Sequence, residues 1–163
     1  MKFGEVPVGE AMGGIVAHAV KREGLVLKKG DVVGVAQIEA LRAAGVASIV
    51  VARLEPRDVG EDEAALALAR AISGANVRVE KPFTGRSNLF SEAAGVLVVD
   101  AARIDRINDV DERVTIATLP PFKTVEPGEM IGTVKIIPFA VPGEALEACV
   151  AEAKDRKSTR LNS

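Results

Sequence analysis

One short segment has residue types and spacing suited to anion binding: Thr84, Gly85, Arg86, Ser87 and Asn88. We predict that it follows a strand and opens a helix, where unpaired backbone N–H groups and the positive helix end attract negative charge. Gly85 would let a ligand approach the backbone, and Arg86 offers a planar guanidinium for a phosphate or a carboxylate. The alternative is ordinary helix capping by Ser87 or Asn88 beside a solvated arginine.

Three further polar residues lie in predicted strands or near a helix end. Lys135 alternates with Val134 and Ile136, so we expect it on the opposite face of a strand, either solvated or facing an anion. His18, the only histidine, is either a hydrogen-bonded structural residue or a catalytic one. Asn108 either ends its helix or reaches a polar ligand.

Cysteine and histidine usage limits the possible chemistry. Cys149 is the only cysteine, which excludes an internal disulfide and a Cys-based zinc cluster. It shares the apolar phase of a helical pattern with Leu146 and Val150, so we predict a small buried hydrophobic residue. We expect no metal site, and no Gly-x-Ser-x-Gly turn supports a Ser–His–Asp triad.

The elements that must position these residues follow from hydrophobic periodicity and turn signals. We predict a mixed α/β chain (α+β), in which strands alternate with short helices. The expected strands cover residues 15–20, 25–27, 46–53, 77–81, 96–99, 114–119 and 130–141. The expected helices cover residues 36–44, 61–73, 88–94, 101–108 and 144–154.

A break between Pro56 and Gly60 predicts two small subdomains. The first, residues 1–55, is a strand–helix–strand subdomain. The second, residues 56–141, is an α/β subdomain. Residues 142–154 start a helix or form a linker to a downstream domain.

The last nine residues differ from the rest of the chain. Residues 155–163 are polar and mostly basic, and they lack an amphipathic period. Their sequence resembles the translation of a common sequencing-library adapter, so we expect a non-native tail after Lys154 and a fragment of a longer protein. A frayed native terminus is the alternative.

Composition defines the broad class of protein. The 163 residues are 48% hydrophobic and 27% charged with a net charge of −2, which describes a soluble globular chain rather than a disordered one. No stretch approaches 18 uncharged apolar residues, so we expect no membrane span. With 3% aromatic residues and no basic excess, a nucleic-acid surface is not expected. The amino terminus lacks a signal pattern, which predicts a cytoplasmic protein.

Residues 28–46, followed by Ile49, Val50 and Val51, resemble a segment of the molybdopterin molybdenumtransferases. In that family a helix after a Lys-Lys-Gly turn precedes a strand that leads toward the molybdopterin-binding domain. The wider chain is more similar to a group of bacterial molybdopterin-binding proteins, some fused to a molybdenum-cofactor cytidylyltransferase. The matching segments are residues 17–18, 84–89, 95–100, 117–120 and 134–141.

This resemblance implies a role in molybdenum-cofactor biosynthesis, with molybdopterin as the cofactor and a transferase-like parent protein. The glycine-rich pterin-binding domain of these proteins follows the region present here, so we expect the chain to support or orient that domain. The region would also contribute to the cofactor cleft or to a homodimer. The residues expected at the pterin phosphate are Arg86, Asn88 and Lys135, with Thr84, Gly85 and Ser87 beside them.

One departure from the family pattern and two other functions are part of this prediction. Val35 and Ala36 replace the family's usual Thr cap and polar neighbour, which predicts a weaker helix start. Ala-rich helices with few polar groups also fit a structural or dimerisation module without a ligand. A small phosphosugar- or nucleotide-binding domain that uses residues 84–88 is the other alternative. We do not expect the fragment to be catalytic alone.

Overall fold

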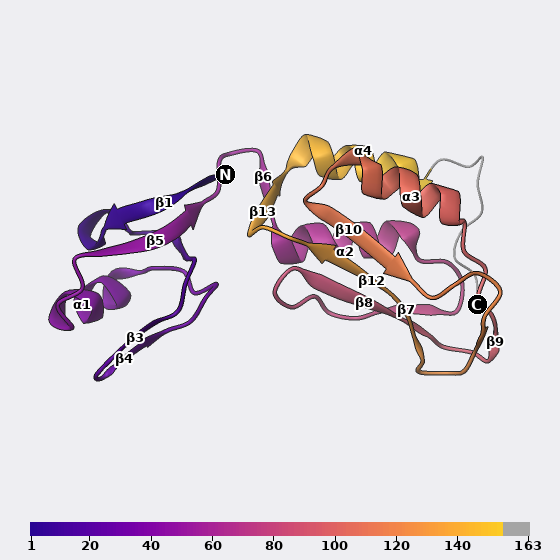
Figure 1. The fold of residues 1–163 in the computed structure, drawn as a ribbon, viewed down its shortest axis with the longest axis horizontal. Helices are drawn as coiled ribbons and strands as arrows, with labels where there is room; N and C mark the ends of the chain where they lie inside the picture. The colour runs from indigo at the N-terminus through magenta and orange to yellow at the C-terminus, as the bar shows by residue number, and fades with distance from the viewer. Residues whose placement is uncertain (155–163) are drawn as a thin grey trace. The chain divides into compact units, whose positions relative to one another are not determined.

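The computed structural model describes residues 1–154, which divide into two compact units. Unit 1 runs from Met1 to Arg57, and unit 2 begins at Asp58. Both units combine helices with antiparallel strand pairs, so the predicted mixed α/β class is confirmed (Figure 1). The expected non-native tail, residues 155–163, lies outside the described residues.

Unit 1 is built on a three-stranded sheet with the order β1–β5–β2. A hairpin of β3 and β4 and the helix α1 complete it. The elements are β1 (Lys2–Pro7), the 3-10 helix η1 (Val8–Glu10), β2 (Ile15–Val16), β3 (Val20–Arg22), β4 (Leu25–Leu27), α1 (Val35–Ala43) and β5 (Ser48–Arg53). Buried residues from η1, β2, β4, α1 and β5 form one apolar core, and the partly buried Val6 of β1 and Val20 of β3 pack against it.

Hydrogen bonds and glycines at its two ends define where α1 begins and where it stops. At its start the Gln37 side chain accepts a hydrogen bond from the Gly34 N–H at 3.1 Å, but Gly34 has no side chain to cap the N–H groups of the first turn. At its end Gly45 has a φ of +68°, and the Val46 N–H donates to the Leu41 carbonyl at 3.0 Å. The helix predicted for residues 36–44 is therefore confirmed.

The strand predicted over residues 15–20 is wrong in its centre. β2 ends at Val16, and only one further bond, from the Ala17 N–H to the Val50 carbonyl at 3.0 Å, continues the pairing with β5. His18 and Ala19 are exposed and separate β2 from β3. The chain leaves the sheet here because β3 pairs with β4 instead of β5.

Unit 2 contains a four-stranded antiparallel sheet with the order β10–β12–β8–β7. Two short strand pairs, β13 with β6 and β11 with β9, lie outside this sheet. The strands are β6 (Asp58–Gly60), β7 (Val77–Val79), β8 (Arg86–Ser91), β9 (Gly95–Val96), β10 (Val114–Thr118), β11 (Thr124–Val125), β12 (Met130–Ile136) and β13 (Ala140–Pro142). The helices are α2 (Glu61–Ile72), α3 (Ala101–Val110) and α4 (Gly143–Lys154).

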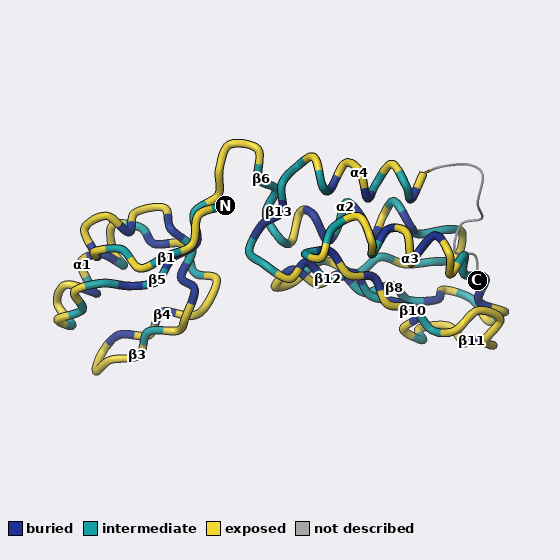
Figure 2. The backbone as a smooth tube through the Cα atoms, turned by 45° about the horizontal axis from the view of Figure 1, so that its top comes forward, coloured by how far each residue is buried: buried dark blue, intermediate teal, exposed yellow. Residues whose placement is uncertain are grey.

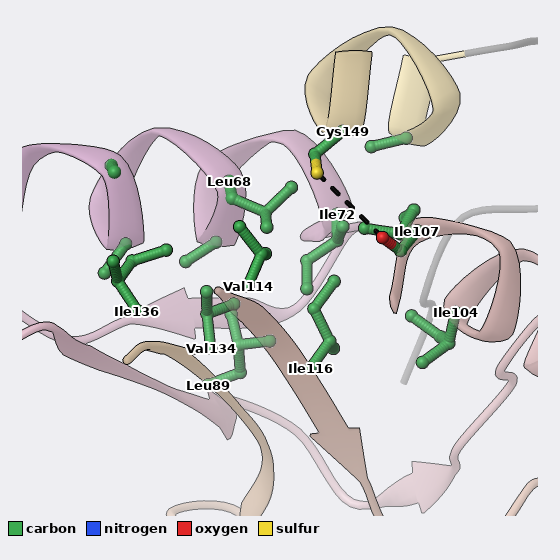
Figure 3. Close-up of a cluster of buried hydrophobic side chains, with 14 of the residues drawn as sticks. Leu68, Ile72, Leu89, Ile104, Ile107, Val114, Ile116, Val134, Ile136 and Cys149 are labelled. Atoms are coloured by element: carbon green, nitrogen blue, oxygen red, sulfur yellow. Dashed lines mark hydrogen bonds between the residues drawn. The ribbon is translucent and has the colours of Figure 1, made fainter. Parts of the chain in front are cut away.

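The helices of unit 2 cover one face of this sheet (Figure 3). Leu68 of α2, Ile107 of α3 and Cys149 of α4 share a cluster with strand residues such as Leu89 and Val134. α2 contacts β8 and β12, α3 contacts β10, and α4 packs against both α2 and α3. The end of the described chain is thus part of the core, and Figure 2 shows α4 with buried residues on one side and exposed residues on the other.

The helix predicted for residues 88–94 is wrong. Residues 88–91 belong to β8, which pairs with both β7 and β12, and residues 92–94 form the bend before β9. Other helices agree with the prediction: Glu61, Asp62 and Glu63 occupy the first turn of α2, and the Asp100 carboxylate accepts a bond from the Arg103 N–H at 3.1 Å at the start of α3. Among the described helices, none combines the length and apolar character needed to cross a membrane.

Candidate functional site

The segment expected to open a helix is instead a tight hairpin turn between β7 and β8. The Phe83 and Arg86 backbones pair through two hydrogen bonds of 2.9 and 3.1 Å. Between them Thr84 and Gly85 have φ angles of +49° and +72°, as a type I′ turn requires at both central positions. The segment therefore has no helix N-terminus that could attract an anion.

Gly85 is needed for close packing inside the protein. Its N–H donates to the Asp62 carboxylate at 2.7 Å, and its carbonyl accepts from the Ile136 N–H at 2.8 Å. A Cβ at this position would lie 2.7 Å from both the Ile136 carbonyl oxygen and the Glu61 carboxylate. The predicted approach of a ligand to this backbone is wrong, because protein atoms already occupy the space.

Ser87 faces the helices. It is fully buried, and its hydroxyl donates to the Glu80 carbonyl at 2.8 Å. Because side chains alternate along a strand, its neighbours Arg86 and Asn88 lie on the opposite face of the sheet. The structure thus separates the residues that the sequence grouped together.

The face of the sheet away from the helices brings three of the predicted residues together. Antiparallel pairing sets Lys135 of β12 directly opposite Arg86 of β8, and Thr133 opposite Asn88. On the next strand Thr115 of β10 is the partner of Lys135. The strands β8, β12 and β10 lie side by side in the sheet (Figure 1). We call the following five residues on them the polar face: Arg86, Asn88, Thr115, Thr133 and Lys135.

Hydrogen bonds link most of the polar face. The Thr133 hydroxyl donates to the Asn88 side-chain oxygen at 2.9 Å, and the Asn88 amide donates to the Glu80 carboxylate at 2.8 Å. The Arg86 guanidinium reaches the Thr133 hydroxyl only at 3.4 Å, and the Lys135 ammonium donates to the Thr84 carbonyl. Asn88 and Thr133 are therefore held in place, whereas Arg86 has one long contact.

The two cations of the polar face belong to directly opposed residues, Arg86 and Lys135, and neither has a carboxylate partner within hydrogen-bonding distance in residues 1–154. Directly opposed residues in an antiparallel pair have Cα atoms about 4.5 to 5.5 Å apart. Like charges at such positions repel each other. A phosphate or carboxylate bound between Arg86 and Lys135 would remove this repulsion.

Sequence reasoning missed Thr115 and Thr133 as members of this face. The signal was present in the alternation of Val134 and Ile136 with Thr133 and Lys135, which places the latter two residues together. The pairing of β8 with β12 could not be predicted from local sequence, because the two strands are distant in the chain.

The remaining candidate residues are Asn108, Cys149 and His18, and each contacts other residues of the chain. Both predicted roles of Asn108 are wrong: α3 continues to Val110, and the Asn108 amide bonds the N–H and the carbonyl of Ile116 at 2.8 and 3.0 Å. The predicted burial of Cys149 is confirmed, and burial raises the pKa of its thiol. The exposed His18 ring lies edge-on to Phe3 with centroids 6.4 Å apart. In the described part of the chain, no three His, Cys, Asp or Glu residues are grouped as metal ligands.

Comparisons with known proteins concern mainly unit 1. A family model described as a domain of unknown function (DUF8806) matches residues 5–53. The matched residues all lie within unit 1, from Met1 to Arg57. Neither the curated proteins nor the solved structures give a match to this chain.

Proposed function

We propose that this chain is the amino-terminal part of a cytoplasmic molybdopterin-binding protein of molybdenum-cofactor biosynthesis, and that unit 2 contacts the phosphate of the cofactor. A downstream domain would bind the rest of the pterin. The observation that carries the proposal is the direct pairing of Arg86 with Lys135 on the polar face. The resemblance in residues 84–89 and 134–141, which contain this pair, supports the same assignment.

The donors of the polar face fit a phosphate group. Arg86 offers a planar set of N–H donors, Lys135 a second positive charge, and Thr115 an exposed hydroxyl. Asn88 is fixed by Thr133 and Glu80, so the groups that would turn toward an anion are the Arg86 guanidinium, which has one long contact, and the Lys135 ammonium, which bonds the Thr84 carbonyl. When bound, molybdopterin would supply the dithiolene group that holds molybdenum, and this chain would supply charge and orientation.

A titration of the chain with molybdopterin, and separately with inorganic phosphate, tests the proposal. We expect Arg86→Gln and Lys135→Gln each to weaken binding of both probes about tenfold, since each removes a charge-assisted contact. Arg70→Gln on the exposed surface of α2 makes the same change in net charge away from the polar face and serves as the control. Unchanged affinity in Arg86→Gln would overturn the assignment.

A structural or dimerisation module is the second candidate function. It is supported by the hydrogen bonds that Asn88 donates to Glu80 and accepts from Thr133, which leave these groups satisfied without a ligand. Light scattering on residues 1–154 separates the two proposals. A dimer whose assembly is unchanged by phosphate and by Arg86→Gln would favour the module, whereas a monomer that binds phosphate would exclude it.

A further inference from the structure

We propose that unit 1 carries its own binding site for a small zwitterion of the α-amino acid type, between β5 and the segment that contains His18 and β3. A pocket of about 240 Å³ lies here, entirely within unit 1. Its volume is below the range of about 300 to 1,000 Å³ that is typical of pockets for drug-sized ligands. The pocket therefore suits a small metabolite, and it is separate from the polar face of unit 2.

One wall of the pocket is acidic. Glu5 of β1 and Val50 of β5 are directly opposed, and Ser48 lies on the same face two residues away from Val50. The Ser48 hydroxyl donates to the Glu5 carboxylate, which fixes the carboxylate at the sheet surface. This wall presents a positioned negative charge beside the apolar Val50 side chain.

The other wall is basic. In the β3–β4 hairpin Arg22 is opposed to Leu25 and Val20 to Leu27. Both leucines are buried in the core of unit 1, whereas Arg22 is exposed, and Val20 and Arg22 both line the pocket. Arg22 thus brings a guanidinium to the pocket, while Val20 contributes to its apolar floor.

The two charges do not neutralise each other. Within residues 1–154 Glu5 bonds Ser48, and the Arg22 guanidinium donates to the neighbouring Lys21 carbonyl at 2.9 Å, so no ion pair joins the walls. A ligand with both an ammonium and a carboxylate can satisfy both walls at once. A ligand with only one charge would leave the opposite wall without a partner.

The exposed edge of β5 adds backbone groups to the site. The Ala47 carbonyl accepts a bond from Val8 on the β1 side, so by alternation the N–H and carbonyl of Ser48 point to the other edge. β2 ends at Val16 and does not extend to Ser48. Ser48 can therefore hydrogen-bond the ammonium or carboxylate of a ligand, as an additional strand would.

Titration of the ¹⁵N-labelled chain with L-leucine tests this inference by NMR. We expect saturable shifts of the Val20, Arg22 and Ser48 amides in the millimolar range. Isocaproate and isoamylamine, which lack the ammonium and the carboxylate of leucine respectively, should bind at least about tenfold more weakly. Shifts of equal affinity for leucine and inorganic phosphate would show a simple anion site and overturn the proposal.

Matched variants test the two walls separately. Glu5→Gln retains an acceptor for Ser48 and should weaken leucine binding about tenfold, as should Arg22→Gln. The controls are Glu39→Gln on α1 and Lys28→Gln after β4, both exposed and outside the pocket lining. If a wall variant folds and binds leucine like its control, or if leucine produces no shifts up to its solubility limit, the inference is wrong.

Discussion

The two units of this chain differ in how completely their secondary structure covers an apolar core. In unit 2 three helices, α2, α3 and α4, pack on one face of a four-stranded sheet. In unit 1 one α-helix, the 3-10 helix η1 and a short hairpin accompany a sheet of three strands. Small domains bury a smaller fraction of their surface than large ones, so their stability is lower. We therefore expect the stability of unit 1 to depend more strongly on each core residue than the stability of unit 2.

The first prediction compares the same substitution in the two cores. Leu41 of α1 and Leu68 of α2 are both fully buried, and Leu→Ala at such sites destabilises by about 2 to 5 kcal/mol. A unit of the length of unit 1 has a total stability of roughly 3 to 8 kcal/mol. We expect Leu41→Ala to unfold a large fraction of unit 1, and Leu68→Ala to leave unit 2 folded with faster hydrogen exchange.

Hydrogen exchange of the full chain, read peptide by peptide, measures both effects. Val35→Ala on α1 and Val110→Ala on α3 remove exposed apolar side chains and serve as controls, with expected changes below about 0.5 kcal/mol. Faster exchange in both units after Leu41→Ala would contradict the division into two units.

The second prediction concerns the edge strand β10 of unit 2. The Asn108 amide occupies the N–H and the carbonyl of Ile116, which point away from β12. Asn108→Ala leaves both backbone groups without this partner and should lower the free energy of unfolding by about 2 kcal/mol. It also uncovers a strand edge, and such edges promote aggregation. Denaturant titration and light scattering measure the two effects.

The adjacent Asp109 provides the control for this edge. Asp109 is exposed, and Asp109→Ala should change stability by less than about 0.5 kcal/mol. An Asn108→Ala variant that is as stable and as monomeric as Asp109→Ala would show that water replaces the amide at no cost.

Helix α1 and strand β8 show how much of the fold was predictable from sequence. The regular apolar spacing of Ile38 and Leu41, with Gly45 behind them, identified α1 within one residue. β8 was missed because its inward positions include Ser87 and Ser91, whose hydroxyls are satisfied by the Glu80 and Ala93 carbonyls. Buried serines conceal the alternation by which a strand is recognised.

The candidate site was predictable only in part for a related reason. Arg86, Asn88 and Lys135 were chosen for their chemistry, and strand pairing brings them onto one face. The helix that was expected to organise them does not exist, because Thr84 and Gly85 form a hairpin turn. The sequence of a segment shows which side chains could bind a ligand, whereas the order of strands in a sheet depends on contacts between distant segments.

The third prediction uses pH to compare an ion pair of unit 2 with one of unit 1. The Arg113 guanidinium bonds both carboxylate oxygens of Asp111 at 2.8 and 2.6 Å and lowers the pKa of Asp111 below its ordinary value of 3.8. The ionised carboxylate therefore stabilises unit 2 above the unfolded-state pKa, and this stability is lost as the pH falls through the folded-state pKa.

We expect Asp111→Asn to lower the free energy of unfolding by about 1 kcal/mol at neutral pH, since Arg113 is partly exposed and solvent screens the pair. The difference from the native chain should vanish in acid. In unit 1 the exposed Lys2 lies 4.0 Å from Glu55, and Lys2→Gln should have no measurable effect. A difference for Asp111→Asn that persists in strong acid would mean that its carboxylate charge is not responsible.

The smallest expected effect separates the two functions proposed for unit 2. Arg86 faces Lys135, and its own contact with Thr133 is long, so Arg86→Gln should raise the free energy of unfolding by about 0.2 to 0.5 kcal/mol at low salt. High salt should abolish the gain, and Arg70→Gln should not show it. If Arg86→Gln stabilises the fold and abolishes phosphate binding, Arg86 serves a ligand and not stability. Core residues such as Leu68 show the opposite, since their removal destabilises the fold. Destabilisation by Arg86→Gln would instead mark a structural residue and favour the module without a ligand.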